Sequence, residues 1–237
     1  MCTVTFWPRR QGYALAMNRD ENLARVTGLP PHTFSLGHRK AMGPSEPGGG
    51  TWISLNDRGA CLALINWYSI TRRAPGRPVS RGTVVAATRW ADDPVAANGI
   101  LVDLPLRQLN PFRLLGFFPA GRQIIEWRWD LQKLSRHFHR WAGQQWVSSG
   151  FDETMAQQIR GKTFRAARSQ KTAGRLDWLR RLHRSHSPQT GPFSTCMHRA
   201  DAATVSYTEV LVQRADQSMN YHAGPPCERK ELFACRF

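Results

Sequence analysis

The sequence is poor in acidic residues, and almost all of its positive charges are Arg rather than Lys. Its 237 residues contain 33 Lys and Arg but only 17 Asp and Glu, which gives a formal net charge of +16. A nucleic-acid-binding protein usually gathers such charge in a basic tail, on one helix or in a recognised motif. Here the cations are spread along the chain in short pairs such as Arg72-Arg73. We therefore predict a solvated basic surface that attracts a small anionic ligand, and no specific nucleic-acid partner.

Long apolar runs are also absent from the sequence. No stretch approaches the roughly 20 apolar residues that a membrane-spanning helix requires. The N-terminal residues lack the basic leader, apolar stretch and small-residue cleavage site of a secretory signal. A hydrophobic content of 41% and nine Trp are typical of a chain with a buried core. We expect a globular protein without a transmembrane segment, located in the cytoplasm.

The five cysteines form an odd set without a Cys-x-x-Cys pair. This pattern argues against a disulfide framework and against a structural zinc site, and reduced thiols fit the cytoplasm. Cys61 and Cys196 lie in apolar stretches, where cysteine usually behaves as a core residue.

Two histidine pairs, His137/His139 and His183/His186, have spacings compatible with metal or haem ligation. Isolated pairs without Cys or carboxylate support are usually surface histidines. The sequence therefore predicts no metal site.

The chain opens on a predicted β-hairpin. Residues 2–7 and 13–18 alternate like strands, and the turn falls within residues 8–12. A turn centred near Arg10 places Cys2 opposite Asn18, with Asp20 as a diagonal neighbour within side-chain reach.

The later elements follow from apolar periodicity and turn residues. Residues 22–50 are rich in Pro, Gly and His and are expected to form an irregular loop, and a second hairpin is expected over 51–55 and 60–66. Helices are predicted after Ser80, after Asp93-Pro94, over 153–168 and around 176–182. Further strands are predicted over 112–118, 123–129, 145–149, 193–198, 203–212, 219–222 and 232–237. Two blocks of strands with paired helices predict one α+β domain over 1–237, a four-layer αββα sandwich with mostly antiparallel sheets.

Cys2 is the residue with the clearest chemical potential. Removal of Met1 would leave a thiol and a free α-amine on one residue, which is a complete nucleophile and base. Arg19 is a candidate cation for the thiolate, and Asp20 is a candidate to fix the protonated amine or orient Arg19. Asn18 and Asn66 are candidate donors to the oxyanion of acyl transfer. From spacing alone, a cysteine at position 2 can equally be an accident of position. The charged residues 19–21 can likewise be a solvated strand end without a chemical role.

A family resemblance favours the chemical interpretation. Met1-Cys2-Thr3 followed by Met17-Asn18-Arg19-Asp20-Glu21 resembles the NRDE family, the transport and Golgi organisation type of protein. The resemblance covers most of the chain and continues through Gly49-Gly50-Thr51-Trp52-Ile53-Ser54-Leu55-Asn56, Arg58-Gly59, Ala63-Leu64-Ile65-Asn66, Ser80-Arg81-Gly82, Asn110-Pro111-Phe112-Arg113-Leu114-Leu115, Ser148-Ser149-Gly150-Phe151-Asp152 and the segment 195–207.

That family in turn is similar to the cysteine N-terminal-nucleophile (Ntn) hydrolases, which include bile salt hydrolases and penicillin acylases. The resemblance implies that Cys2 is the catalytic cysteine. In those enzymes an Arg and an Asp lie at the end of the second strand and an Asn closes a later strand, and the matching residues here are Arg19, Asp20 and Asn66. The acylases have a further catalytic Asn and Arg in their second half. No Asn matches near residues 204–207, where Thr204 or Arg199 is the available substitute.

Two functions follow from the resemblance. The first is a cysteine hydrolase or acyltransferase that acts on an amide (C–N) or thioester bond of a small anionic or amphipathic substrate and needs no cofactor. The second is a non-catalytic carrier on the same fold for haem or an acyl-coenzyme A-like ligand, as the association of eukaryotic relatives with haem trafficking and lipid metabolism implies. Retention or loss of Met1, and the reactivity of Cys2, separate the two.

Overall fold

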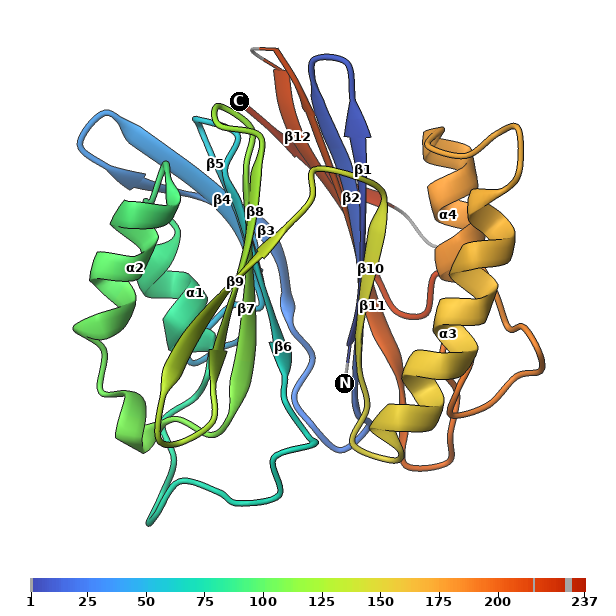
Figure 1. The fold of residues 1–237 in the computed structure, drawn as a ribbon, viewed down its shortest axis with the longest axis horizontal. Helices are drawn as coiled ribbons and strands as arrows, with labels where there is room; N and C mark the ends of the chain where they lie inside the picture. Colours follow the sequence, from blue (N-terminus) through green and yellow to red (C-terminus); the bar gives the residue numbers. More distant parts are fainter. Residues whose placement is uncertain (1, 215, 229–231) are drawn as a thin grey trace. The chain divides into compact units, whose positions relative to one another are not determined.

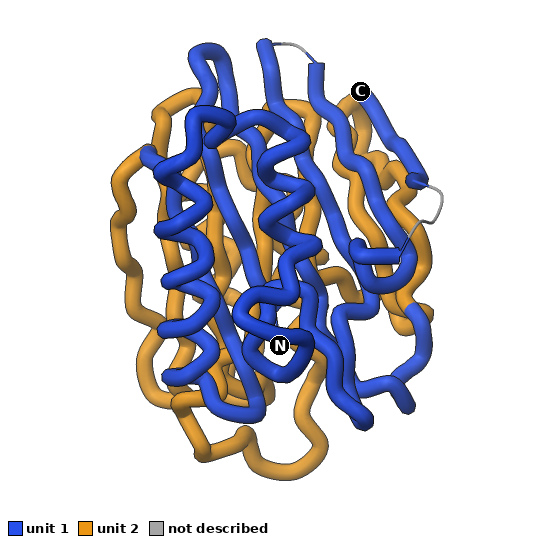
Figure 2. Tube along the Cα trace, turned by 90° about the vertical axis from the view of Figure 1, so that its right-hand side faces the viewer, with its two compact units in different colours: residues 1–27, 142–236 blue, residues 28–141, 237 orange. Residues whose placement is uncertain are grey.

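Two antiparallel sheets account for most of the chain, and each has a pair of helices on one face (Figure 1). The structure is a computed structural model that describes residues 2–214, 216–228 and 232–237. The chain divides into two compact units, residues 1–27 with 142–236 and residues 28–141 with 237 (Figure 2). The single domain expected over 1–237 stays a prediction. No helix among the described residues is long and apolar enough to cross a membrane.

The first unit contains a six-stranded sheet. In sheet order its strands are β10 (Gln144–Ser148), β1 (Cys2–Arg9), β2 (Gly12–Asn22), β11 (Ala202–Gln213), β12 (Asp216–Ala223) and β13 (Leu232–Arg236). Helices α3 (Glu153–Arg168) and α4 (Leu176–Arg184) lie side by side on one face of this sheet (Figure 2). Asp152 caps α3 by accepting a hydrogen bond from the backbone N–H of Met155 at 2.9 Å.

Small residues on β2 allow helix α4 to pack closely on the first sheet. Ala14 and Ala16 are fully buried against Trp178 and Leu182, which recur at helical spacing along α4. Trp7 of β1 adds an edge-on contact to Trp178, with ring centroids 5.0 Å apart. The helix-covered face of this sheet is therefore defined by Ala14, Ala16 and their neighbours two residues along each strand.

The second unit contains a seven-stranded sheet. In sheet order its strands are β3 (Leu29–Leu36), β4 (Arg39–Ser45), β5 (Ile53–Asn56), β6 (Cys61–Asn66), β7 (Phe112–Phe118), β8 (Gln123–Trp129) and β9 (Leu134–His139). Helices α1 (Gly82–Thr88) and α2 (Pro94–Val102) precede a short 3₁₀ helix, Leu106–Gln108. Leu62, Leu114 and Trp127 pack with Val84 and Leu101 in one buried cluster.

The predicted α+β class with antiparallel sheets is confirmed, but three local predictions are wrong. Residues 22–50 form strands β3 and β4 rather than a loop, and β9 was not predicted. Strands β3 and β9 are the two edges of their sheet, where polar residues and Pro are tolerated and the apolar alternation is weak. Residues 193–198 form no strand, and Cys196 and Met197 are buried in a long connection instead.

Two glycines of the family motifs meet in the second unit. Gly50 precedes Thr51, whose backbone N–H donates to the carbonyl of Gly82 at 3.1 Å. A Cβ on Gly82 would lie 2.9 Å from both the Cα of Gly50 and the N of Thr51, and neither backbone atom has room to move aside easily. The Gly-Gly-Thr and Ser-Arg-Gly motifs are therefore halves of one close backbone contact.

We predict that Gly82→Ala lowers the free energy of unfolding by about 1–3 kcal/mol, because the new methyl group overpacks this contact. Urea denaturation monitored by Trp fluorescence measures the change. Gly99→Ala is the matched control, since a Cβ there meets nothing within 4 Å in helix α2. Ala in a helix interior should raise stability by up to about 1 kcal/mol. Equal destabilisation by both variants would contradict the proposed contact.

Candidate active site around Cys2

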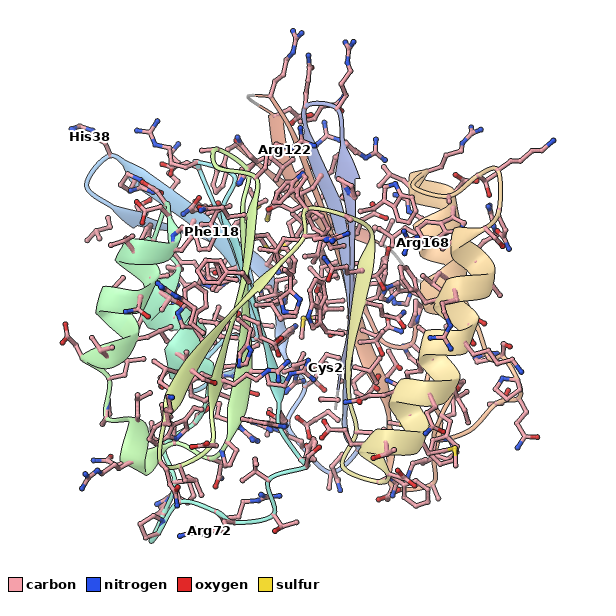
Figure 3. The ribbon with its side chains drawn as sticks, in the orientation of Figure 1. Cys2, His38, Arg72, Phe118, Arg122 and Arg168 are labelled. Atoms are coloured by element: carbon pink, nitrogen blue, oxygen red, sulfur yellow. The ribbon has the colours of Figure 1, made fainter. Side chains whose placement is uncertain are left out.

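Cys2 begins β1 and lies on the face of the first sheet away from α3 and α4 (Figure 3). Its partner on β2 is Arg19, so the expected pairing with Asn18 is wrong by one residue. Arg9 pairs with Gly12, so the hairpin turn is the two-residue loop Arg10-Gln11. The turn is therefore centred between Arg10 and Gln11, and not on Arg10 as the sequence suggested. A one-residue slip exchanges the two faces of a strand. Arg19 therefore shares the face of Cys2, and Asn18 and Asp20 alternate onto the helix-covered face.

Four side chains form a row across this sheet at the level of Cys2. Ser148 on β10 pairs with Cys2, and Ser206 on β11 pairs with Arg19. A β-bulge between Thr204 and Ser206 resets the register of β11 at this point. All four members of the row are buried, with exposed fractions of 7% for Cys2, 5% for Arg19, 1% for Ser206 and 0% for Ser148.

The hydroxyl group of Ser148 has no hydrogen-bond partner among the described residues, whereas that of Ser206 interacts with Tyr221. A buried polar group left without a partner costs about 1–3 kcal/mol, and native structures usually give such a group a role. Because Ser148 lies on the strand beside Cys2, its hydroxyl is a donor available to a ligand at this face. Both serines lie in segments that carry the family resemblance, but the sequence predicted neither as a site residue.

Opposing effects act on the Cys2 thiol. Burial raises the pKa of Cys2 above its ordinary value, and the negative charge of Asp20 raises it further. The positive charge of Arg19 lowers the pKa of the same thiol. Arg19 also forms an ion pair with Glu21 at 3.3 Å, and Glu21 binds Arg25 at 2.9 Å. Arg19 is thus the side chain of the row that favours the thiolate.

Asp20 is held by a buried ion pair with Arg160 of helix α3. The Nη1 of Arg160 donates to Asp20 Oδ2 at 3.0 Å and to Thr3 Oγ1 at 2.6 Å, and both charged side chains are fully buried. Thr204 Oγ1 donates to the other carboxylate oxygen of Asp20 at 2.7 Å. Asp20 therefore ties the ends of β1 and β2 to α3 and β11.

The periodicity of the sequence over α3 carries a signal for the buried position of Arg160. Helix α3 buries Glu153, Ala156, Arg160 and Phe164, a stripe at helical spacing in which Arg160 occupies a core position. A charge at such a position requires a buried partner. Asp20 supplies that partner.

Asn18 lies in a second buried network on the helix-covered face. Its Nδ2 donates to the carbonyls of His183 at 2.9 Å and Thr195 at 2.8 Å, and its Oδ1 lies 3.0 Å from His183 Nδ1. His183 Nε2 lies 2.9 Å from Thr5 Oγ1. Since both amide hydrogens of Asn18 bind backbone carbonyls on this face, Asn18 does not serve as the oxyanion donor that the sequence suggested.

His183 is fully buried rather than a surface residue as predicted. Burial lowers the pKa of His183 to about 3, with a further contribution from the charge of Arg160. The neutral ring donates from Nδ1 to Asn18 and accepts from Thr5 at Nε2, because the Asn18 oxygen is only an acceptor. This histidine is therefore a structural link between β1, β2 and α4.

The remaining predicted residues lie elsewhere. Asn66 ends β6 in the second unit, and its Nδ2 donates to Tyr68 Oη at 2.8 Å. Arg199 binds Asp201 at 2.8 Å and stacks 4.6 Å from the ring centroid of Phe151. Thr204, the other substitute considered, belongs to the Asp20 network.

The pair His137/His139 is also explained by local contacts in the second unit. His139 Nε2 lies 2.8 Å from the buried carboxylate of Glu126, and His137 Nε2 lies 3.1 Å from Ser135 Oγ. Glu126 also binds Arg128 at 2.9 Å. These histidines belong to a charge cluster on β8 and β9.

We predict that Arg160→Met destabilises the protein by about 3–5 kcal/mol, because it removes the buried cation that pairs with the Asp20 carboxylate. The double variant Asp20→Asn with Arg160→Met should recover part of this loss, since the carboxylate charge is removed as well. A double-mutant cycle in urea measures the coupling. Additive effects of the two substitutions would show that the pair is not coupled.

We also predict that the free energy of unfolding falls as the pH is lowered from about 6.5 toward 3. These limits are the pKa values of His183, about 6.5 in the unfolded state and about 3 in the folded state. Between these values the unfolded state binds a proton that the folded state excludes, at a cost of up to about 1.4 kcal/mol per pH unit. His183→Gln should flatten the dependence of the unfolding free energy on pH between about 6.5 and 5. The exposed His38→Gln is the control, and an unchanged slope in His183→Gln would contradict the assignment.

Comparisons with known proteins bear on this site. Residues 1–117 match the protein family described as Transport and Golgi organisation 2. No curated protein matches the chain significantly in sequence.

Solved structures with a similar fold include penicillin V acylase from Agrobacterium tumefaciens, with a TM-score of 0.56 and 10% identity over 99% of this chain and 85% of that chain. Two variants of conjugated bile acid hydrolase from Clostridium perfringens also match over 99% of this chain and 92% of theirs. The cysteine-to-alanine variant has a TM-score of 0.53 and 10% identity, and the arginine-to-leucine variant has 0.56 and 9%. At this identity the likeness shows the fold alone, which is that of the Ntn hydrolases.

Proposed function

Because the chain belongs to the Transport and Golgi organisation 2 family and has the fold of the Ntn hydrolases, we propose that it is a hydrolase or acyltransferase with Cys2 as nucleophile. The observation that carries the proposal is the buried row in which Cys2 lies between Ser148 and Arg19 on neighbouring strands. A thiol, a cation and the unpartnered hydroxyl of Ser148 on one face are components that acyl transfer requires.

The proposed reaction begins with removal of Met1, which leaves a free α-amine on Cys2. This amine accepts the thiol proton, and the thiolate sulfur attacks the carbonyl carbon of an amide or thioester. The resulting oxyanion accepts hydrogen bonds from nearby donors, for which Ser148 is the candidate on the neighbouring strand. Collapse breaks the scissile bond, and the leaving amine or thiol takes the proton from the α-ammonium. Water or another acyl acceptor then releases the acyl group from Cys2.

Arg19 is proposed to stabilise the thiolate and to attract an anionic group of the substrate. Met17, Leu15 and Phe6 on the same face of the hairpin are fully buried and belong to the core. We propose a small anionic or amphipathic acyl compound as the substrate. Cofactors are not needed for this reaction, and we propose that it takes place in the cytoplasm.

The other predicted residues have separate proposed roles. Asp20 and Asn18 act as positioning residues, since the first anchors the strand ends through Arg160 and the second anchors β2 to α4. Asn66 is proposed as a further oxyanion donor on the resemblance of its sequence motif to the acylases.

We predict that intact-protein mass spectrometry finds the chain without Met1, and that iodoacetamide labels Cys2 ahead of the other cysteines near neutral pH. Arg19→Gln should slow this labelling, because loss of the positive charge raises the pKa of the thiol. Cleavage of a panel of amide and thioester substrates should fall to background in Cys2→Ala and by about 10²-fold or more in Arg19→Gln. Cys235→Ser, in an edge strand, is the control for a cysteine outside the site.

Retention of Met1 or an inert Cys2 would overturn the proposal. The carrier function would then be favoured if Cys2→Ala binds haem or an acyl-coenzyme A as tightly as the unmodified chain. Ser148→Ala separates the two functions further, because loss of an oxyanion donor lowers turnover without preventing ligand binding.

A further inference from the structure

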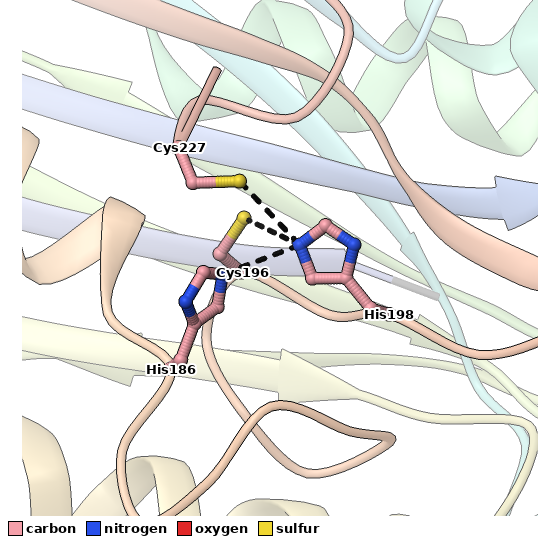
Figure 4. Close-up of side chains that lie close together, drawn as sticks. All are labelled: His186, Cys196, His198 and Cys227. Atoms are coloured by element: carbon pink, nitrogen blue, oxygen red, sulfur yellow. Dashed lines mark hydrogen bonds between the residues drawn. The ribbon is translucent and has the colours of Figure 1, made fainter.

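Four potential metal ligands from three segments of the first unit converge (Figure 4). His186 follows helix α4, Cys196 and His198 lie in the connection to β11, and Cys227 lies between β12 and β13. One ligand atom from each side chain lies within 4.8 Å of the others. Cys196 is buried and Cys227 is exposed, so the cluster lies at the edge of the unit.

The distances match those between the ligands of a tetrahedral zinc ion. His186 Nε2 lies 3.2 Å from His198 Nε2, and the sulfurs of Cys196 and Cys227 each lie 3.5 Å from the same nitrogen. With Zn–N near 2.0–2.1 Å and Zn–S near 2.3 Å, a tetrahedron places its two nitrogens about 3.3 Å apart and each nitrogen about 3.6 Å from a sulfur. Two imidazoles and two thiolates form a common zinc-binding set.

Hydrogen bonds alone do not account for this arrangement. His198 Nε2 is approached by one nitrogen and two sulfurs, yet a neutral imidazole nitrogen carries at most one proton. The three neighbours therefore cannot all be satisfied by that nitrogen. A cation at the centre of the four ligands satisfies every one of them.

The surrounding backbone holds the ligands in place. The N–H of Cys196 donates to the carbonyl of Ser185 at 3.0 Å, which joins the segment of the first histidine to that of the first cysteine. Both ring nitrogens of His222 lie 3.1 Å from carbonyls, those of Gly224 and Glu228, on either side of Cys227. The site is thus built from fixed segments.

The cluster is scattered in sequence, which is why the sequence predicted no metal site. Zinc ligands are usually found as pairs such as Cys-x₂₋₄-Cys, whereas here Cys196 is paired with His198 two residues on and Cys227 is far along the chain. Of the pair His183/His186, only His186 belongs to the cluster, so the spacing of the pair does not indicate the site.

We propose that His186, Cys196, His198 and Cys227 bind one zinc ion, which clamps three segments of the first unit together. The clamp lies next to the Asp20 network. Met197, between two of the ligands, accepts a hydrogen bond from the N–H of Thr204 at 2.8 Å and donates its own N–H to Thr204 Oγ1 at 2.9 Å. The zinc ion therefore supports the segment that positions Thr204 against Asp20, independently of any reaction at Cys2.

The test uses the full chain, purified in reducing buffer. Elemental analysis by mass spectrometry should find one zinc per chain, and replacement by Co²⁺ should give the intense visible bands of a tetrahedral thiolate site. Cys227→Ser and His186→Ala should each weaken Zn²⁺ binding by more than about tenfold in a competition titration with a chromogenic chelator. Cys235→Ser, which keeps all four ligands, should bind Zn²⁺ as the unmodified chain does.

A second readout separates metal loss from misfolding. Excess chelator should lower the Tm of the unmodified chain and of Cys235→Ser, but not that of Cys227→Ser, which already lacks the clamp. Cys227 is exposed, so its replacement by Ser should preserve the circular dichroism spectrum.

The proposal is overturned if the folded chain binds neither Zn²⁺ nor Co²⁺, or if Cys227→Ser binds them unchanged. It is equally overturned if Cys196 and Cys227 form a disulfide in reducing buffer. None of these results bears on the labelling of Cys2, so failure here is distinguishable from failure of the proposed catalysis.

Discussion

The antiparallel pairing of β1 with β2 determines what the residues around Cys2 can do. Once Arg19 is opposite Cys2, strand alternation assigns each member of the Asn-Arg-Asp-Glu motif to a face. Arg19 shares the face of the thiol, whereas Asn18 and Asp20 enter the buried layer between the sheet and its helices. The motif is therefore two interleaved sets of side chains, one on the face of the Cys2 thiol and one in the buried layer beneath the helices.

The set in the buried layer has a common physical origin. A buried carboxylate is tolerated only with a buried cation and further hydrogen bonds, and Asp20 obtains these from Arg160 and Thr204. A buried amide needs acceptors for both hydrogens, and Asn18 finds them in the carbonyl of His183 in α4 and the carbonyl of Thr195 in the connection after it. The two networks fix the strand ends on which Cys2 and Arg19 are placed.

Much of the fold could be predicted from the sequence because the central strands and the helices carry strong periodic patterns. Helix 153–168 and the strands 112–118 and 123–129 agree with the structure residue for residue. Edge strands β3 and β9 could not be predicted, since one side of such a strand has no neighbour to enforce alternation.

The candidate site was predicted less completely than the fold. Cys2, Arg19 and Asp20 were found through a motif, but a half-residue error in the turn placed Asn18 on the wrong face. Arg160, Ser148 and the four potential zinc ligands come from distant segments. Their meeting depends on sheet order and loop packing, which local patterns do not encode.

The place of β1 inside its sheet has a consequence for synthesis of the protein. The strand that carries Cys2 pairs with β2 on one side and on the other with β10, which is translated more than half a chain length later. Until then one edge of β1 is open, and such long-range pairing forms slowly. The first residues of the chain are therefore without their second neighbouring strand until β10 has emerged. The proposed removal of Met1 falls in this interval.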